Sequence, residues 1–308
     1  MTTDSPISAG DARLETNGRS AHQIKPEGFK PPKATHRTQH VLPGFHASLG
    51  ITLTYLSLIV LLPLVALVLR PWEAGLDGFI RTVTDERVLK ALQLSFTTAF
   101  WAAVVNLFAG LIVAWVLTRY EFPGKKIIDA IVDLPFALPT AVAGVSLSSL
   151  YAPNGWVGSL FDPMGIKIAY TPIGIFIALV FIGLPFVVRS VQPVLAEFDA
   201  EVEEAALTLG ATPMQTAIRV ILPSLAPALI TGFSLAFARA VGEYGSVIFI
   251  AGNMPYISEI SPLLIVIKLE EFDYAGAASV AIAMLALSFT ILLVTNFVQV
   301  LLSRRGRA

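Results

Sequence analysis

Two charged side chains interrupt a long apolar stretch in the last third of the chain. Arg239 and Glu243 occur within FARAVGEYGSVIFIAGNMP, residues 237–255, and their i, i+4 spacing puts both on one face of a helix. Because charge is costly at membrane depth, such residues usually face a bundle interior or a watery path. The pair predicts either a salt bridge that fixes helix packing or a direct contact with a polar solute.

A second unusual stretch is IVDLPFALPTAVAGVSL, residues 131–147, which carries two prolines four residues apart. Each proline removes a helical N–H donor, so Pro135 and Pro139 predict a bent or interrupted helix. Irregular backbone at membrane depth is tolerated where protein or water covers it. The two prolines are therefore candidates for an inner gate, and a kinked helix with a purely structural role is the alternative.

The third stretch, EEAALTLGATPMQTAIRVILP, spans residues 203–223 between two apolar segments. Acidic residues before it favour a helix N-terminus, so a short helix is predicted to begin near Asp199. Gly210 can end that helix in a left-handed conformation, and Pro213 suits the first turn of a second helix. An isolated pair of such short helices is marginal in water. The stretch is either a docking element for another protein or a loop that packs against its own helix ends.

The composition indicates an integral membrane protein, because the chain is 55% hydrophobic and 14% charged, against roughly 25% charged residues in a soluble domain. The net charge of −1 supports no general attraction to nucleic acid. There is no cysteine, and all four histidines lie at residues 22, 36, 40 and 46. We therefore expect no catalytic residues and no metal site. Because no GxxxxGK[ST] sequence occurs, the chain is not expected to bind ATP itself.

The apolar segments predict an all-α polytopic bundle behind a polar N-terminal tail. Residues 1–48 have few large apolar groups to bury and are predicted to be a disordered tail, and residues 49–308 the membrane domain. Six segments have about the length needed to span a bilayer. They are Leu49–Leu69, Ala91–Leu117, Ile127–Leu150, Pro172–Val188, Leu229–Ile250 and Ala277–Leu302.

The distribution of Lys and Arg predicts the orientation. Of 21 such residues, 14 fall in the tail, in segments 118–126 and 189–228 and at the C-terminal end, and six fall on the opposite side. Basic residues are retained on the cytoplasmic side. Both termini and the 203–223 stretch are therefore predicted to be cytoplasmic.

The 203–223 stretch resembles the EAA motif of ABC importer permeases, E-A-A-x3-G-x9-I-x-L-P. The matching residues are Glu204, Ala205, Ala206, Gly210 and the sequence Val220-Ile221-Leu222-Pro223, with valine where isoleucine is usual. In that family the loop forms a coupling helix that docks into a cleft of a cytoplasmic ATPase. The resemblance implies that role for Glu204, Ala205, Ala206 and Gly210, within a coupling region at about 199–223.

The sequence Gly242-Glu243-Tyr244-Gly245 resembles the G-E-[FY]-G of the sulfate and molybdate branch of these permeases. Together with PLLIVIKLEEFDYAGA, residues 262–277, it is more similar to the sulfate/thiosulfate members than to the molybdate ones. The resemblance covers roughly residues 49–302. It implies a MetI-like type I importer permease fold with its core at about 91–302.

The resemblance also implies a function and an assembly. The chain is expected to be a permease subunit that moves sulfate or thiosulfate across the inner (plasma) membrane into the cytoplasm. Its expected partners are a CysW-like second permease chain, two copies of a CysA-like ATPase that carry ATP and Mg²⁺, and a periplasmic sulfate/thiosulfate-binding protein. A molybdate or tungstate permease and an ion-coupled secondary transporter are the alternatives.

A permease must hold its solute loosely, because strong binding slows release. A dianion need not meet a matching charge, since backbone N–H groups and hydroxyls can satisfy its oxygens. The candidates for the translocation path or bundle interior are Arg239, Glu243, Tyr244, Ser234 and Ser246.

Overall fold

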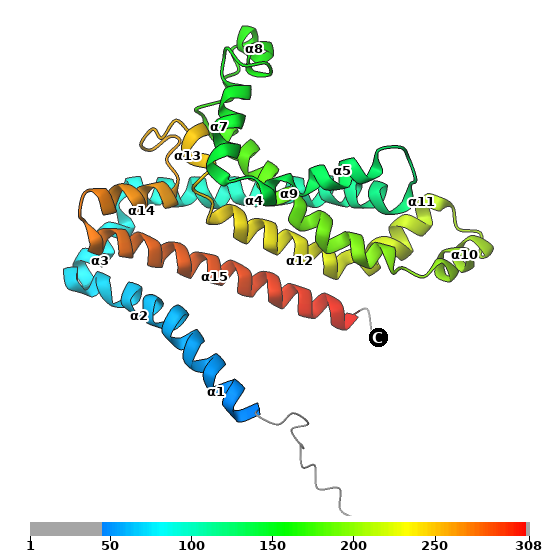
Figure 1. Cartoon of the computed structure of the whole chain (residues 1–308), viewed down its shortest axis with the longest axis horizontal. Helices are drawn as coiled ribbons and strands as arrows, with labels where there is room; N and C mark the ends of the chain where they lie inside the picture. The colour runs from blue at the N-terminus through cyan, green and yellow to red at the C-terminus, as the bar shows by residue number, and fades with distance from the viewer. Residues whose placement is uncertain (1–44, 306–308) are drawn as a thin grey trace, which may run out of the picture. The chain divides into compact units, whose positions relative to one another are not determined.

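The computed structural model describes residues 45–305, and within this range all regular elements are helical. The prediction of an all-α fold is confirmed. The helices are α1 (Phe45–Leu56), η1 (Ser57–Leu61), α2 (Leu62–Leu69), η2 (Arg70–Ala74), α3 (Gly75–Thr84), α4 (Glu86–Arg119), α5 (Lys125–Val132), α6 (Leu134–Ala137), α7 (Thr140–Tyr151), α8 (Gly158–Phe161), η3 (Asp162–Met164), α9 (Pro172–Ala196), α10 (Ala200–Thr208), α11 (Pro213–Thr216), η4 (Ala217–Ile221), α12 (Leu222–Val241), α13 (Val247–Ile250), α14 (Ser261–Glu270) and α15 (Tyr274–Arg305) (Figure 1).

The chain divides into two compact units, residues 1–53 and 54–308. Most of the first unit, residues 1–44, lies outside the described residues, as do residues 306–308. The predicted disordered tail therefore stays a prediction.

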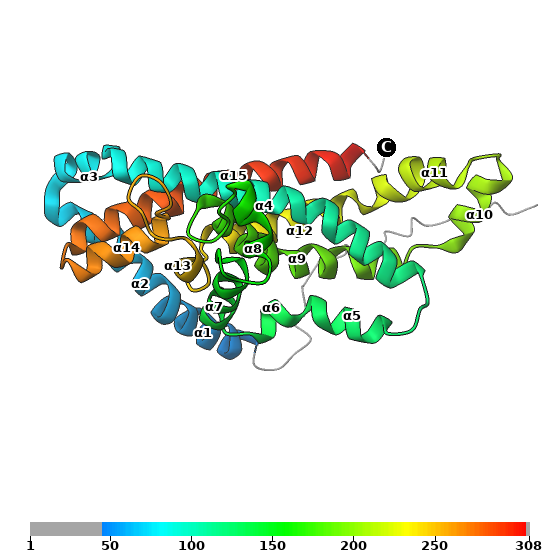
Figure 2. The same ribbon diagram turned by 90° about the horizontal axis from the view of Figure 1, so that it is seen from above.

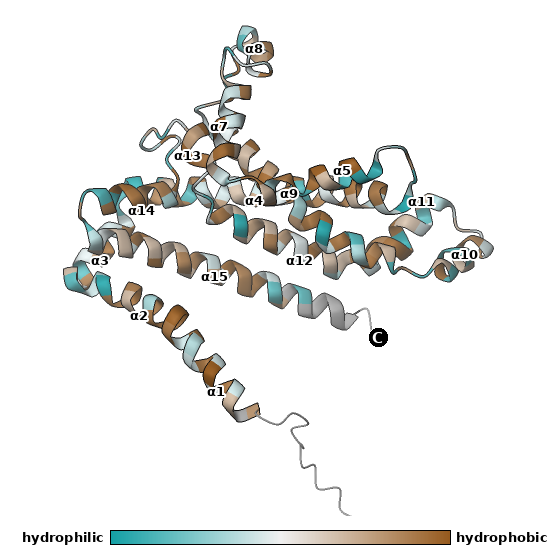
Figure 3. Cartoon of the chain, in the orientation of Figure 1, coloured by the Kyte–Doolittle hydropathy of each residue, from teal (hydrophilic) through white to brown (hydrophobic). Residues whose placement is uncertain are grey.

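Among the described residues, five helices are long and apolar enough to cross a bilayer, and they overlap five of the six predicted spans. Figure 3 shows hydrophobic residues along α2, α9 and α15, three of the helices that these spans contain. The five are Ala47–Thr84, Glu86–Arg119, Pro172–Ala196, Pro213–Val241 and Tyr274–Phe297.

The third predicted span is not one helix but the series α5, α6 and α7. Leu138 has an extended backbone, with φ −81° and ψ 135°, and so ends α6 directly before Pro139. A residue before proline is disfavoured in the helical region, because its backbone and Cβ clash with the proline ring. The interruption predicted from Pro135 and Pro139 is confirmed, and the predicted continuous span is corrected to a broken one.

The fifth predicted span, Leu229–Ile250, also differs from the structure. The continuous helix begins earlier, at Pro213, and ends at Val241. Gly242 and Gly245 follow directly, and glycine disfavours continuation of a helix by about 1 kcal/mol per residue. A short helix, α13, resumes at Val247.

The core of the second unit is formed by α4, α9 and α12, which lie side by side (Figures 1 and 2). Val187 of α9 lies against a glycine of each neighbouring helix. A Cβ added to Gly110 of α4 would lie 2.7 Å from Val187 Cβ, and one added to Gly232 of α12 would lie 2.9 Å from Val187 Cα. Small residues thus let three apolar helices pack closely, which stabilises helix contacts in lipid.

Some of the remaining helices pack against this core and others project from it. The long C-terminal helix α15 contacts α3, α12 and α14. α7 contacts α13 and, with α8, projects away from α4 and α9 (Figure 1). The start of α9 agrees with its sequence, because the Thr171 hydroxyl accepts a hydrogen bond from the Ile173 N–H directly before the helix that opens at Pro172.

Candidate functional site

The predicted helix, turn and second helix at residues 199–223 are present. The Asp199 carboxylate accepts the Glu201 N–H at 3.0 Å and caps α10. Gly210 has φ +83°, the left-handed conformation expected at the end of that helix. Thr212 and Gln215 then form a reciprocal capping box at the start of α11, which runs on through η4 into α12.

The candidate coupling residues lie on a surface that their own chain leaves uncovered. No residue of α10 is buried: Glu204 and Ala205 are exposed and Ala206 is half-buried. Leu209, directly after α10, is 88% exposed. A Cβ added to Gly210 would meet no atom within 4 Å, so the glycine is required by its backbone conformation and not by packing within this chain.

Glu203 differs from the rest of α10 because it forms an ion pair with Arg119 at the end of α4. Glu203 is the first residue of the 203–223 stretch, and no partner for it is predicted from the sequence. The two residues are 84 positions apart. At this separation, the local sequence pattern does not predict that they form a pair.

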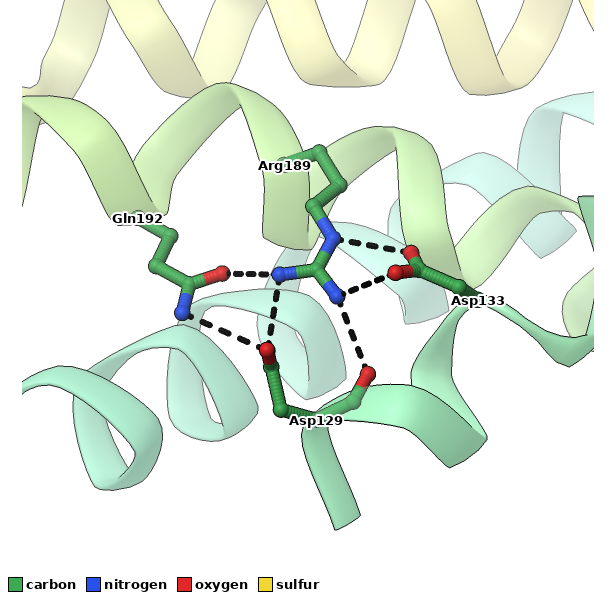
Figure 4. A network of polar contacts seen from close by, with 4 residues as sticks. All are labelled: Asp129, Asp133, Arg189 and Gln192. Carbon is green, nitrogen blue, oxygen red and sulfur yellow. Dashed lines mark hydrogen bonds and ion pairs between the residues drawn. The ribbon is translucent and has the colours of Figure 1, made fainter. Parts of the chain in front are cut away.

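The candidate inner gate is connected to α9 by a network around Arg189 (Figure 4). Arg189 Nε and Nη2 donate to the two carboxylate oxygens of Asp133 at 2.8 and 2.6 Å. Nη1 donates to Asp129 Oδ1 at 2.7 Å and to Gln192 Oε1 at 2.6 Å, and Nη2 donates to the Asp129 carbonyl at 2.9 Å. All five N–H donors of the guanidinium are therefore used.

This network joins the segment that carries the two prolines to a helix of the core. Asp129 lies in α5, and Asp133 directly precedes α6, which contains Pro135. No role for Arg189 is predicted from the sequence, where it was counted in the cytoplasmic segment 189–228. The structure places it within α9, and the apolar sequence PFVVRSVQPV, residues 185–194, was the available signal that the helix continues past it.

Arg239 and Glu243 form the predicted ion pair. Glu243 is only 2% exposed, and its Oε1 accepts hydrogen bonds from Ser246 N at 2.8 Å and Ser246 Oγ at 3.0 Å. The helix has already ended at Val241, so the carboxylate satisfies an amide that the helix break sets free. The Glu243 carboxylate therefore stabilises both the interrupted backbone at Ser246 and the guanidinium of Arg239.

The break after α12 lies against the break before α7. A Cβ added to Gly144 of α7 would lie 2.4 Å from the Ser246 carbonyl oxygen. A Cβ added to Gly245 would lie 2.1 Å from Thr140 Oγ1, at the first residue of α7. Two helix interruptions distant in sequence are thus brought into direct contact.

The other candidate residues of the translocation path are Ser234, Tyr244 and Ser246. Ser234 is half-buried, and its hydroxyl donates to the Ile230 carbonyl at 2.8 Å. Tyr244 is half-buried between Glu243 and Gly245, and Ser246 is fully buried. Within residues 45–305, no group of three or more His, Cys, Asp or Glu residues could hold a metal ion.

Comparison with known protein families identifies the family to which this helix bundle belongs. Residues 106–308 match the family model described as "Binding-protein-dependent transport system inner membrane component". The chain belongs to this family. The binding-protein-dependent permeases are membrane components of transport systems, so the chain is a membrane transport subunit.

Curated relatives of this permease confirm its similarity to the sulfate branch. It is 48% identical to the "Sulfate transport system permease protein CysT" of Salmonella typhimurium, over 88% of this chain and 96% of that protein. It is 50% identical to the CysT of Synechocystis sp., over 81% of this chain and 87% of the relative. The CysT of Escherichia coli is 47% identical over 88% of this chain and 96% of that protein.

Solved structures support the same fold for the permease. A bacterial ABC transporter involved in the import of alginate has a chain that aligns with a TM-score of 0.70 at 16% identity, over 82% of this chain and 94% of that chain. The MetNI methionine ABC transporter aligns with a TM-score of 0.53 at 19% identity, over 70% of this chain and 96% of that one. The predicted MetI-like permease fold is confirmed.

One further ion pair in the permease was not singled out by the sequence analysis. Arg87, in the first turn of α4, donates from Nε and Nη2 to Glu259 at 2.8 and 2.7 Å. The Glu259 side chain is 1% exposed. The pair spans 172 residues and fixes the loop after α13 to a core helix.

Proposed function

We propose that this chain is a permease subunit of an ATP-driven importer that moves sulfate or thiosulfate into the cytoplasm. The observation that carries the proposal is the 47–50% identity to sulfate transport system permeases over most of the chain. The EAA spacing of Glu204, Ala205, Ala206 and Gly210 supports the ATP-driven class, because an ion-coupled transporter has no use for it.

The exposed α10 is the proposed coupling helix. It presents Glu204 and Ala205 to the outside of the chain, as does Leu209 directly after it, so a cleft of a CysA-like ATPase can enclose them. Two copies of that ATPase would bind ATP and Mg²⁺, and this chain would bind no cofactor. The orientation with both termini cytoplasmic follows from the distribution of Lys and Arg, and the family description supports the inner membrane as its location.

The remaining partners follow from the same class. A CysW-like second permease chain would complete the pathway, and a periplasmic sulfate- or thiosulfate-binding protein would deliver the anion. ATP-driven closure of the ATPases would move the coupling helices and switch the bundle between two states.

The proposed pathway runs past the contact between the two helix breaks. Arg239 is 35% exposed although it is paired with the buried Glu243, so its guanidinium can reach a passing anion. Tyr244 and Ser234 are half-buried on the same segment. Ser246 supports the pathway through Glu243, to which its hydroxyl already donates. Pro135 and Pro139 would end the pathway at an inner gate.

The test is uptake of labelled sulfate by liposomes that contain all subunits and the binding protein. We expect uptake that requires ATP inside the liposome, persists when ion gradients are dissipated, and is inhibited by unlabelled thiosulfate. Inhibition by molybdate instead of thiosulfate would assign the chain to the molybdate class. Uptake that continues without ATP and collapses with the ion gradient would refute the importer class.

A further inference from the structure

The proposed coupling helix has little contact with the chain that carries it. α10 contributes no residue to the hydrophobic core. Within the described residues, the ion pair between Glu203 and Arg119 is the one side-chain polar contact that joins α10 to another helix. At its ends the helix is attached only through the turns at residues 197–199 and 209–212.

Arg119 is well placed to anchor α10. It is the last residue of α4, and its Cζ lies 5.6 Å from the ring centroid of Trp115 one turn earlier. A guanidinium over an indole face is attracted by the ring and loses conformational freedom. The side chains of Arg119 and Glu203 are only 25% and 26% exposed. Solvent therefore screens this pair less than it screens a fully exposed pair.

The helix behind Arg119 is rigid. Leu117 and Ala114, in the same last turns of α4, are 2% and 0% exposed within the core formed with α9 and α12. A force on Glu203 therefore reaches a buried helix directly. The covalent route from α10 to the core passes through the turns at residues 197–199 and 209–212, and Phe198 of the first turn packs against the core.

Glu203 and Glu204 are neighbours in α10, but their carboxylates lie on different sides of the helix. Successive residues of an α-helix are about 100° apart around the axis. Glu203 is accordingly half-buried toward Arg119, whereas Glu204 is exposed on the outward side. One carboxylate holds α10 to the bundle while the next remains available to a docked protein.

We propose that Arg119 is a positioning residue for transport: through Glu203 it holds α10 against α4 and transmits the displacement of a docked ATPase to the membrane core. This inference rests on the proposed function of α10. It assigns Arg119 and Glu203 a role that does not depend on touching either ATP or the transported anion.

The experiment compares variants of the complete importer in liposomes, measuring labelled sulfate uptake, ATP hydrolysis and ATPase co-purification together. The variants are Arg119→Gln, Glu203→Gln, Arg119→Lys and the charge exchange Arg119→Glu with Glu203→Arg. The matched control is Lys125→Gln, which removes the nearby pair of Lys125 with Glu121, whose side chain is 87% exposed.

We expect each Gln variant to lower the sulfate taken up per ATP hydrolysed about five- to tenfold. Arg119→Lys keeps the charge and should lose less, the charge exchange should recover at least half of the loss, and Lys125→Gln should behave as wild type. The Gln variants could also lose ATPase binding, and the charge exchange could restore it. That result supports the proposal as well, because it shows that α10 is held in the orientation for docking only when the ion pair is present.

Two results would overturn the inference. One is a wild-type uptake-to-hydrolysis ratio in both Gln variants, and the other is a charge exchange no better than either single variant. Failure of the proposed function is distinguishable, because the wild-type importer itself would then show no ATP-dependent sulfate uptake.

Discussion

The Arg189 network provides the sharpest test of the energetics of the candidate gate. The perturbation is a double-mutant cycle of Arg189→Gln with Asp133→Asn, which isolates the energy of one pair from the other contacts of Arg189. Asp133 accepts two hydrogen bonds from Arg189, at 2.8 and 2.6 Å. The bonds are short and parallel, which is the strong form of an arginine–carboxylate contact.

The expected magnitude lies between two limits. Exposed ion pairs contribute about 0.2–1 kcal/mol, and hydrogen bonds to charged groups contribute about 1.5–3 kcal/mol. The Arg189 side chain is 31% exposed and that of Asp133 is 47% exposed, so solvent screens the pair in part. We therefore expect a coupling free energy of about 1–2 kcal/mol in the stability of the folded chain.

A second cycle with Asp129→Asn gives an internal comparison. One of the two Asp129 contacts with Arg189 is made by its backbone carbonyl, at 2.9 Å, and survives the substitution. Only the side-chain bond at 2.7 Å is weakened. The coupling for Asp129 should accordingly be about half that for Asp133, or about 0.5–1 kcal/mol.

The assay is equilibrium unfolding of the purified chain in mixed micelles with increasing denaturing detergent. The exposed pair of Lys125 with Glu121 is the control cycle, for which we expect no more than about 0.5 kcal/mol. Raising the salt concentration should weaken all three couplings, most of all the control. An Arg189–Asp133 coupling no larger than the control would refute the reasoning, because the two parallel hydrogen bonds from the guanidinium would then add nothing to the stability of the folded chain.

Three further substitutions test other parts of the site. Gly210→Val forces a β-branched residue into the left-handed region at a cost of about 1–2 kcal/mol, and we expect weaker ATPase co-purification from a chain that still inserts; unchanged recovery of ATPase would contradict docking there. Glu243→Gln removes the charged partner of Arg239, which is 35% exposed, and should destabilise the folded chain by about 1–2 kcal/mol, measured by detergent unfolding; a loss below about 0.5 kcal/mol would show that water already screens the pair. Gly144→Ala places a Cβ 2.4 Å from a carbonyl oxygen of the facing break and should cost about 1–3 kcal/mol. The matched Gly242→Ala, whose Cβ would lie 4.0 Å from the Ala238 carbonyl oxygen, should leave the stability nearly unchanged, and equal effects would disprove the close contact.

Much of the local structure was predictable because it depends on residues close together in the chain. Asp199 accepts an amide two residues later, and Gly210 adopts the left-handed conformation that ends α10. The break before Pro139 follows from a clash between neighbouring residues. The boundaries of the third and fifth predicted spans were wrong, because the sequence remains apolar through the breaks that proline or glycine makes in the helices.

The partners of the charged residues were not predictable in this way. Arg189 meets Asp133 across 56 residues, and Arg119 meets Glu203 across 84. Each of these residues, read alone, is equally consistent with a solvated loop charge. Only the packing of α9 and α4 in the core decides which carboxylate comes within reach.

The sequence by itself determined that this is a helical membrane permease, that a helix breaks at Pro139, and that a short helix ends at Gly210, because hydropathy, proline and glycine act over a few residues. The tertiary structure decided that the two breaks touch each other, that a guanidinium joins the gate segment to the core, and that one ion pair attaches α10 to α4. These contacts depend on how closely α4, α9 and α12 approach at their small residues, and that distance is a property of the packed bundle.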